Sequence, residues 1–147
     1  MLTISQLLKT EYSELSKNDR RRAFLFLVAH LEIFGETKGF GLLCTTFWRS
    51  PEDQAKAVAA GTSSVKEGYH QQWAAMDLLV LIDGEERWTC DPKNPADPYR
   101  ILGERWEQMH PATAWGGRWR QPFDPYHFQF GGLRTAAAVA ARGETWE

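Results

Sequence analysis

The segment with the clearest structural pattern reads Ala74-Ala75-Met76-Asp77-Leu78-Leu79-Val80-Leu81-Ile82-Asp83-Gly84. Its apolar, β-prone residues predict a strand over residues 74–82 that only Asp77 interrupts. The Asp83-Gly84 pair is a strong signal for a hairpin turn, so residues 87–89 are the expected return strand. A small antiparallel sheet is therefore predicted at the centre of the molecule.

Asp77 is the most informative acid in the chain because apolar residues flank it on both sides. A carboxylate in such a strand is expected to be at least partly buried. A buried charge is costly unless it is paired or bound to a metal. Two interpretations stay open from this pattern alone: a salt bridge to an arginine of the core, or a metal ligand.

Outward from this strand, the pattern predicts helices packed around the sheet, which is an α+β fold. Further strands are expected at residues 40–47 and 127–130, and helices at residues 5–15, 16–35, 51–61, 99–109 and 133–142. The helix that ends at Gly35 begins at an N-cap, either Ser16 or Asn18. The length of 147 residues suits one domain over residues 1–147.

The bulk composition excludes some classes of function. A formal net charge of -2 offers no basic field, so nucleic acid is not an expected partner. No apolar run reaches about 18 residues, which argues against membrane insertion, and the N-terminus lacks the pattern of a signal peptide. Cys44 and Cys90 are isolated thiols that fit a reducing compartment, although a disulfide between them stays open.

Two histidines and a second acid complete the candidate chemistry. Catalytic zinc takes three protein ligands from His, Asp or Glu and keeps one position open. His70 lies just before the strand of Asp77, and His127 opens the strand over residues 127–130. Asp124, three residues before His127, can reach the same space without binding the metal, as a general base must. The alternative is a turn-forming Asp-Pro pair beside a hydrogen-bonded histidine.

Together, the order His70, Asp77 and a distant Asp124-x-x-His127 resembles the zinc D-alanyl-D-alanine carboxypeptidase and L-alanyl-D-glutamate endopeptidase family, especially its small phage endolysins. The resemblance covers about residues 38–130, between helices over residues 1–35 and 133–142, and it implies a fold of the Hedgehog/D,D-peptidase type. The other similar segments, in order, are Phe47-Trp48-Arg49-Ser50-Pro51-Glu52-Asp53-Gln54, Gly61-Thr62-Ser63, the strand and turn from Asp77 to Gly84, Leu102-Gly103-Glu104-Arg105-Trp106 and Trp115-Gly116-Gly117.

The resemblance implies a role for each matched residue. It implies that a zinc ion is held by His70, Asp77 and His127. Asp124 would accept a proton from the attacking water and pass it to the leaving amine. Substrate would be bound by Arg49, Gln54 and Ser63, and the planar fork of Arg49 suits the scissile carbonyl or a substrate carboxylate. Arg49 would also be catalytic, because it would help to stabilise the oxyanion. Without the resemblance, Arg49 reads as a surface residue at a helix start.

Two positions depart from the family pattern, and both fall near the expected cleft. Gly68 stands where many members carry a serine, and Trp73 stands where a small or polar residue is frequent. Substrate preference is therefore more in question than the chemistry. Candidates for the missing hydroxyl are Thr62, Ser63 and Ser64. Glu67 is either an additional base or a solvated loop charge.

The expected function is zinc-dependent hydrolysis of a peptide bond in the peptidoglycan stem by a monomeric phage endolysin of the L-alanyl-D-glutamate endopeptidase type. One alternative is a D,D-carboxypeptidase or D,D-dipeptidase on the same scaffold. Another, of a different class, is a non-catalytic virion or wall-binding module that zinc stabilises. We expect synthesis in the host cytoplasm and action in the periplasm or cell wall after release through a separate pore.

Overall fold

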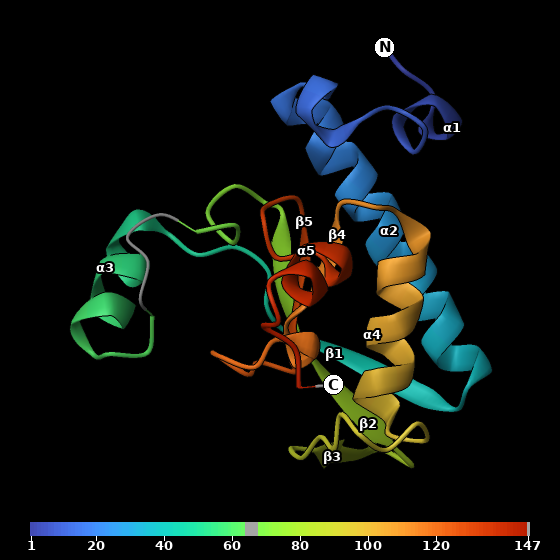
Figure 1. Cartoon of the computed structure of the whole chain (residues 1–147), viewed down its shortest axis with the longest axis vertical. Coiled ribbons are helices and arrows are strands. Elements are labelled where there is room, and N and C mark those ends of the chain that lie inside the picture. Colours follow the sequence, from blue (N-terminus) through green and yellow to red (C-terminus); the bar gives the residue numbers. More distant parts are fainter. Residues whose placement is uncertain (64–67, 147) are drawn as a thin grey trace.

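The computed structural model describes residues 1–63 and 68–146, and it confirms the predicted α+β fold (Figure 1). Its helices are α1 (Ile4–Leu7), α2 (Lys17–Thr37), α3 (Pro51–Ala59), α4 (Pro98–Met109) and α5 (Ala136–Ala141), with 3₁₀ turns η1 (Tyr12–Glu14) and η2 (Gly116–Arg118). Its strands are β1 (Phe40–Thr46), β2 (Ala75–Ile82), β3 (Glu85–Arg87), β4 (Thr113–Trp115) and β5 (His127–Phe130).

The strands form one antiparallel sheet with β2 at its centre. The order is β1-β2-β5-β4, and β3 folds back on β2 as a hairpin. Asp77 of β2 pairs with His127 of β5 on one side and with Thr46 of β1 on the other. This register brings two segments that lie 50 residues apart in the chain to the same point.

Helices α2 and α4 lie side by side against the sheet, whereas α3 lies to one side of them (Figure 1). Their aromatic side chains form the middle of the core. The ring of Trp106 on α4 makes edge-to-face contacts with Phe24 on α2 at 5.9 Å and with Phe128 on β5 at 6.0 Å. The Trp106 indole also donates a hydrogen bond to the Gln129 carbonyl at 3.0 Å. The core thus holds β5 firmly in place.

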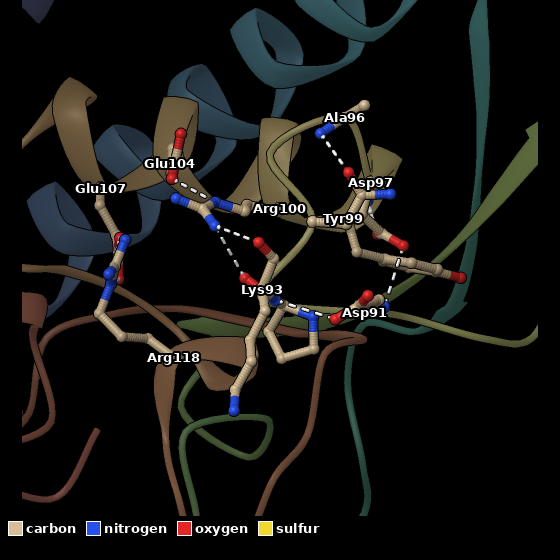
Figure 2. A network of polar contacts seen from close by, with 12 residues as sticks. Asp91, Lys93, Ala96, Asp97, Tyr99, Arg100, Glu104, Glu107 and Arg118 are labelled. Carbon is tan, nitrogen blue, oxygen red and sulfur yellow. Dashed lines mark hydrogen bonds and ion pairs between the residues drawn. The ribbon is translucent and has the colours of Figure 1, made fainter. Parts of the chain in front are cut away.

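A polar network fastens the loop after β3 to α4 (Figure 2). The fully buried carboxylate of Asp97 caps α4 by accepting from the Tyr99 amide at 2.9 Å, and it also accepts from the Asp91 amide at 3.0 Å and from Arg87 at 3.1 Å. Arg100 donates to Glu104 at 2.8 Å. The Tyr99 hydroxyl donates to the Arg87 carbonyl at 2.6 Å. The loop that follows β3 is therefore held by specific bonds.

Several predicted boundaries were wrong. The helix expected over residues 5–15 ends at Leu7, because Tyr12 instead turns to pack edge-on against Phe130 at 4.9 Å. Helix α2 begins after Ser16 and runs past Gly35, which packs against Leu42 of β1.

The hairpin and one short strand also differ from the expectation. The return strand is β3 rather than residues 87–89, because a two-residue turn lets pairing resume at once, with Ile82 opposite Glu85. Strand β4 was not predicted. Cys44 and Cys90 are free thiols. Among the described helices, none combines the length and the apolar character that crossing a membrane requires.

Candidate metal centre

His70, Asp77 and His127 meet at one point, as the sequence predicted. His70 lies in the turn before β2, Asp77 within β2, and His127 at the start of β5. One potential ligand atom from each lies within 4.8 Å of the others. Asp77 Oδ1 is 3.3 Å from His70 Nε2 and 3.2 Å from His127 Nδ1. These three residues are called the metal triad below.

The geometry of the metal triad fits zinc. Ligands at about 2.1 Å from a tetrahedral ion lie about 3.4 Å from each other. The separations of 3.3 Å and 3.2 Å between Asp77 Oδ1 and the two imidazole nitrogens are close to this value. The donor set of two imidazoles and one carboxylate is also one that catalytic zinc uses. Within the described residues, Asp77 is paired with these two histidines, so the alternative of a salt bridge to a core arginine was wrong.

Within the triad, the Asp77 carboxylate and the His127 imidazole influence each other's pKa values. Burial alone raises the pKa of Asp77, but hydrogen bonds from His127 and His70 outweigh it and hold the pKa well below its usual value. Burial lowers the pKa of His127, yet the Asp77 carboxylate reverses this effect and the pKa is raised. The Asp77 carboxylate is therefore ionised, as a metal ligand must be.

Gln129 is a site residue that the motifs of the sequence did not indicate. It is buried on β5, and its Oε1 lies 2.9 Å from His127 Nε2. Its amide nitrogen donates to the Gly131 carbonyl at 2.8 Å, which fixes the orientation of the amide. Because Oε1 can only accept, Nε2 of His127 donates to it, and Nδ1 is the nitrogen that faces Asp77 and would be available to a metal. The signal in the sequence was the period of two, which places residue 129 on the same strand face as residue 127.

The Trp115-Gly116-Gly117 segment explains where Asp124 lies. The Trp115 indole is fully buried, and it donates to the Pro125 carbonyl at 2.9 Å. The Asp124 amide donates to the Gly116 carbonyl at 3.1 Å. A Cβ on Gly116 would lie 2.3 Å from the Asp124 carbonyl oxygen, and one on Gly103 would lie 2.0 Å from the Trp115 ring. These glycines allow the close packing that positions the Asp124 loop.

Asp124 and Asp77 line one pocket of about 160 Å³. Thr45, Trp88 and Tyr126 contribute to its walls. The Tyr126 hydroxyl donates to the Trp88 carbonyl, which ties the loop after β3 to the β5 side. Burial raises the pKa of Asp124, although the positive charge of His127 lowers it in part. An acid with a raised pKa beside a metal ligand has the properties of a general base.

The predicted substrate residues form a second group, at α3. The guanidinium of Arg49 donates to Gln54 Oε1 at 3.0 Å, and the Gln54 amide donates to the Ser63 hydroxyl at 2.8 Å. Gln54 is buried, so the chain of bonds orders all three side chains. The structure brings these residues to each other, and their role toward a substrate stays a prediction.

The chain has two other histidines, and neither belongs to the metal triad. His30 is exposed on α2, and His110 is buried beside Phe130 with its pKa lowered by burial. Ser64 and Glu67 lie outside the described residues. Gly68, which stands in place of the family serine, donates its amide to the Gln71 side chain.

Comparisons with known proteins show similarities to one family and to two solved structures. Residues 61–130 match the model of a family described as D-alanyl-D-alanine carboxypeptidase. The chain is similar to the L-Ala D-Glu endopeptidase ChiX of Serratia marcescens, with 20% identity, a TM-score of 0.58, and coverage of 87% of this chain and 95% of that chain. Among curated proteins, none matches the chain significantly.

A second solved structure is similar to a lesser degree. It is a mutant of the vancomycin-resistance D,D-pentapeptidase VanY from a VanB-type resistance cassette, in complex with Zn(II). The identity is 16%, the TM-score is 0.50, and the match covers 83% of this chain and 78% of that chain. At these identities, both structures show that the fold is shared.

Proposed function

We propose that this enzyme, which belongs to the D-alanyl-D-alanine carboxypeptidase family of zinc peptidases, hydrolyses a peptide bond in the peptidoglycan stem. The observation that supports the proposal most directly is the shared pocket of Asp77 and Asp124, which joins a metal ligand to a base. A purely structural zinc site needs no such base, and it usually has four protein ligands. The non-catalytic alternative is therefore less well supported.

The residues of the pocket divide the work of hydrolysis. Bound zinc would act as a Lewis acid and lower the pKa of water at the open position. Asp124 takes the proton of the attacking water as its oxygen bonds to the scissile carbonyl carbon. Asp124 then gives that proton to the nitrogen as the carbon–nitrogen bond breaks. The metal triad holds its ionised carboxylate and Nδ1 of His127 toward the same space.

The group at α3 is proposed to bind the substrate. Arg49 presents a guanidinium whose orientation is set by the buried Gln54, and Gln54 is itself bonded to Ser63. Such a fork recognises a carbonyl oxygen or a carboxylate of the stem peptide.

The finer proposal is an L-alanyl-D-glutamate endopeptidase that serves a phage in host lysis after release through a separate pore. Its support is the order of motifs similar to phage endolysins, together with the similarity to an L-Ala D-Glu endopeptidase over 95% of that chain. A D,D-carboxypeptidase or D,D-dipeptidase is the competing specificity on the same scaffold.

Digestion of purified murein separates these specificities. An L-alanyl-D-glutamate endopeptidase creates a new amino terminus on glutamate, which dinitrophenylation and mass spectrometry detect, whereas a D,D-peptidase releases alanine from the end of the stem. Digestion should stop when a chelator removes zinc and resume when zinc is returned. Intact murein after incubation with the zinc-loaded protein would contradict the proposed function. Lysis of outer-membrane-permeabilised cells then tests the lytic role.

A further inference from the structure

Trp73 adopts a backbone conformation that bulky residues rarely occupy. Its φ is +59°, in the left-handed region that glycine favours. The residue lies in the turn that carries His70, and its amide donates to the His70 carbonyl at 3.4 Å. A non-glycine residue here is strained, and such strain tends to gather at functional sites. Trp73 is also one of the two departures from the family pattern noted above.

The side chain of Trp73 belongs to an ordered aromatic stack. Its ring is stacked on Trp48, with centroids 5.7 Å apart and planes inclined by 20°. Phe47 meets Trp73 edge-on at 5.7 Å, and the Arg21 guanidinium lies over the Trp73 ring at 6.0 Å. Because segments distant in sequence hold the ring in place, its orientation is defined before any ligand arrives.

The stack is exposed, although its residues are large and apolar. Trp48 is 46% exposed and Trp73 39%. We call this pair the tryptophan platform. In the sequence, Trp48 directly precedes Arg49, and Trp73 follows His70 by three residues. The platform is therefore continuous along the chain with the proposed substrate-binding residues and with the metal triad.

We infer that the tryptophan platform binds a sugar ring of the peptidoglycan glycan strand and thereby holds the attached stem peptide at the metal triad. The inference rests on the proposed function, because the sugar and the scissile peptide belong to the same polymer. The face of a pyranose presents C–H groups, which pack against the electron-rich face of an indole. A rigidly held indole face suits such a ring and loses little conformational entropy on binding.

Binding of a sugar that contains no peptide bond tests the platform directly. Triacetylchitotriose, a trimer of N-acetylglucosamine, is titrated into the zinc-loaded full chain and followed by the NMR signals of the indole N–H groups. We expect saturable binding that Trp48→Ala and Trp73→Gly each weaken about tenfold, the loss that corresponds to one aromatic stacking contact.

Leu133→Ala is the matched control, because Leu133 is a large apolar residue that is 82% exposed and belongs to neither group. It should retain the sugar affinity of the unaltered chain. Absence of binding, or equal affinity in Trp48→Ala, overturns the inference. Loss of affinity in Trp88→Ala without loss in Trp48→Ala places the sugar in the pocket of Asp124 and also overturns it.

Cleavage assays separate the failure of this inference from the failure of the proposed function. The ratio of kcat/KM on murein sacculi to kcat/KM on a sugar-free stem peptide should fall about tenfold in Trp48→Ala. If the unaltered chain cleaves both substrates and this ratio does not change in the variant, sugar binding by the platform is contradicted, whereas the proposed peptidase function is not. If the chain binds the sugar through the platform but cleaves neither substrate, the proposed function fails alone.

Discussion

At the scale of single residues, the metal triad depends on which nitrogen of each histidine faces Asp77. Gln129 decides this for His127, because its Oε1 accepts from Nε2 and its amide is anchored on Gly131. His70 has no such support, since its Nδ1 is buried without a hydrogen-bond partner among the described residues. Outer partners of this kind orient a ligand and tune its affinity for the metal.

Gln129→Leu should therefore weaken zinc binding about 10- to 100-fold, the usual cost of removing an outer partner of a metal ligand. Competition with a chromophoric chelator gives the affinity, and NMR of the imidazole nitrogens reports the tautomer of His127. Gln129→Glu retains an acceptor for Nε2 and should lose less. Unchanged zinc affinity in Gln129→Leu would show that the tautomer of His127 is set by another contact.

Asp124→Ala tests the second functional residue. The variant should keep its zinc and its Tm, because Asp124 is not a member of the metal triad. Murein hydrolysis should fall by about 10²- to 10⁴-fold, since a general base contributes about that factor. The control is Glu36→Ala, an exposed acid on α2. Retained hydrolysis in Asp124→Ala would remove the residue from the mechanism.

At the scale of elements, two packing arrangements bring the chemistry together. The antiparallel register of β2 and β5 places Asp77 opposite His127. The buried Trp115 and the glycines around it hold the loop of Asp124 against the same end of the sheet. A bidentate ion pair between Arg118 of η2 and Glu107 of α4, at 2.7 Å, further fixes this turn.

Gly116→Ala is the variant that tests this arrangement. Its Cβ would lie 2.3 Å from the Asp124 carbonyl oxygen, so the Asp124 loop must move. A displacement of about 1 Å costs about 100-fold in rate, while the metal triad should keep its zinc. The assays are murein hydrolysis and metal analysis. Gly41→Ala serves as the control. Its Cβ would meet a side-chain atom of Leu81 at 3.3 Å, a milder contact that does not involve the Asp124 loop. Equal activity of both variants would contradict the assigned role of Gly116.

At the scale of the whole molecule, a bound zinc ion would link three segments of the chain. The metal triad unites the turn before β2, β2 itself and β5. An ion that binds only the folded chain stabilises it, by about 2.7 kcal/mol at a concentration 100 times Kd.

Removal of zinc should therefore lower the Tm by about 5–10 °C, since 1 kcal/mol corresponds to about 2–4 °C in a chain of this size. Differential scanning calorimetry with and without a chelator measures the shift. His70→Ala lacks one ligand, so the chelator should change its Tm much less. An equal shift in both proteins would mean that the chelator acts elsewhere.

From the sequence alone we could predict the α+β class, the central strand with its hairpin turn, and the three residues that meet at the candidate metal site. Those features depend on local patterns. A run of β-prone residues predicts the strand, and a turn-forming pair predicts the hairpin turn. The triad follows from an acid flanked by apolar residues and from the order of the motifs along the chain. Asp77 was the only triad member that had a physical argument of its own.

The remaining features could not be predicted, because they depend on contacts between segments far apart in the chain. The early end of α1 follows from the packing of Tyr12 on Phe130, and the tautomer of His127 follows from the amide of Gln129. The stack of Trp48 on Trp73 joins segments 25 residues apart and has no local signal. Local patterns in the sequence show which chemical groups a segment carries, whereas the packing of segments against each other decides which atoms of those groups come into contact.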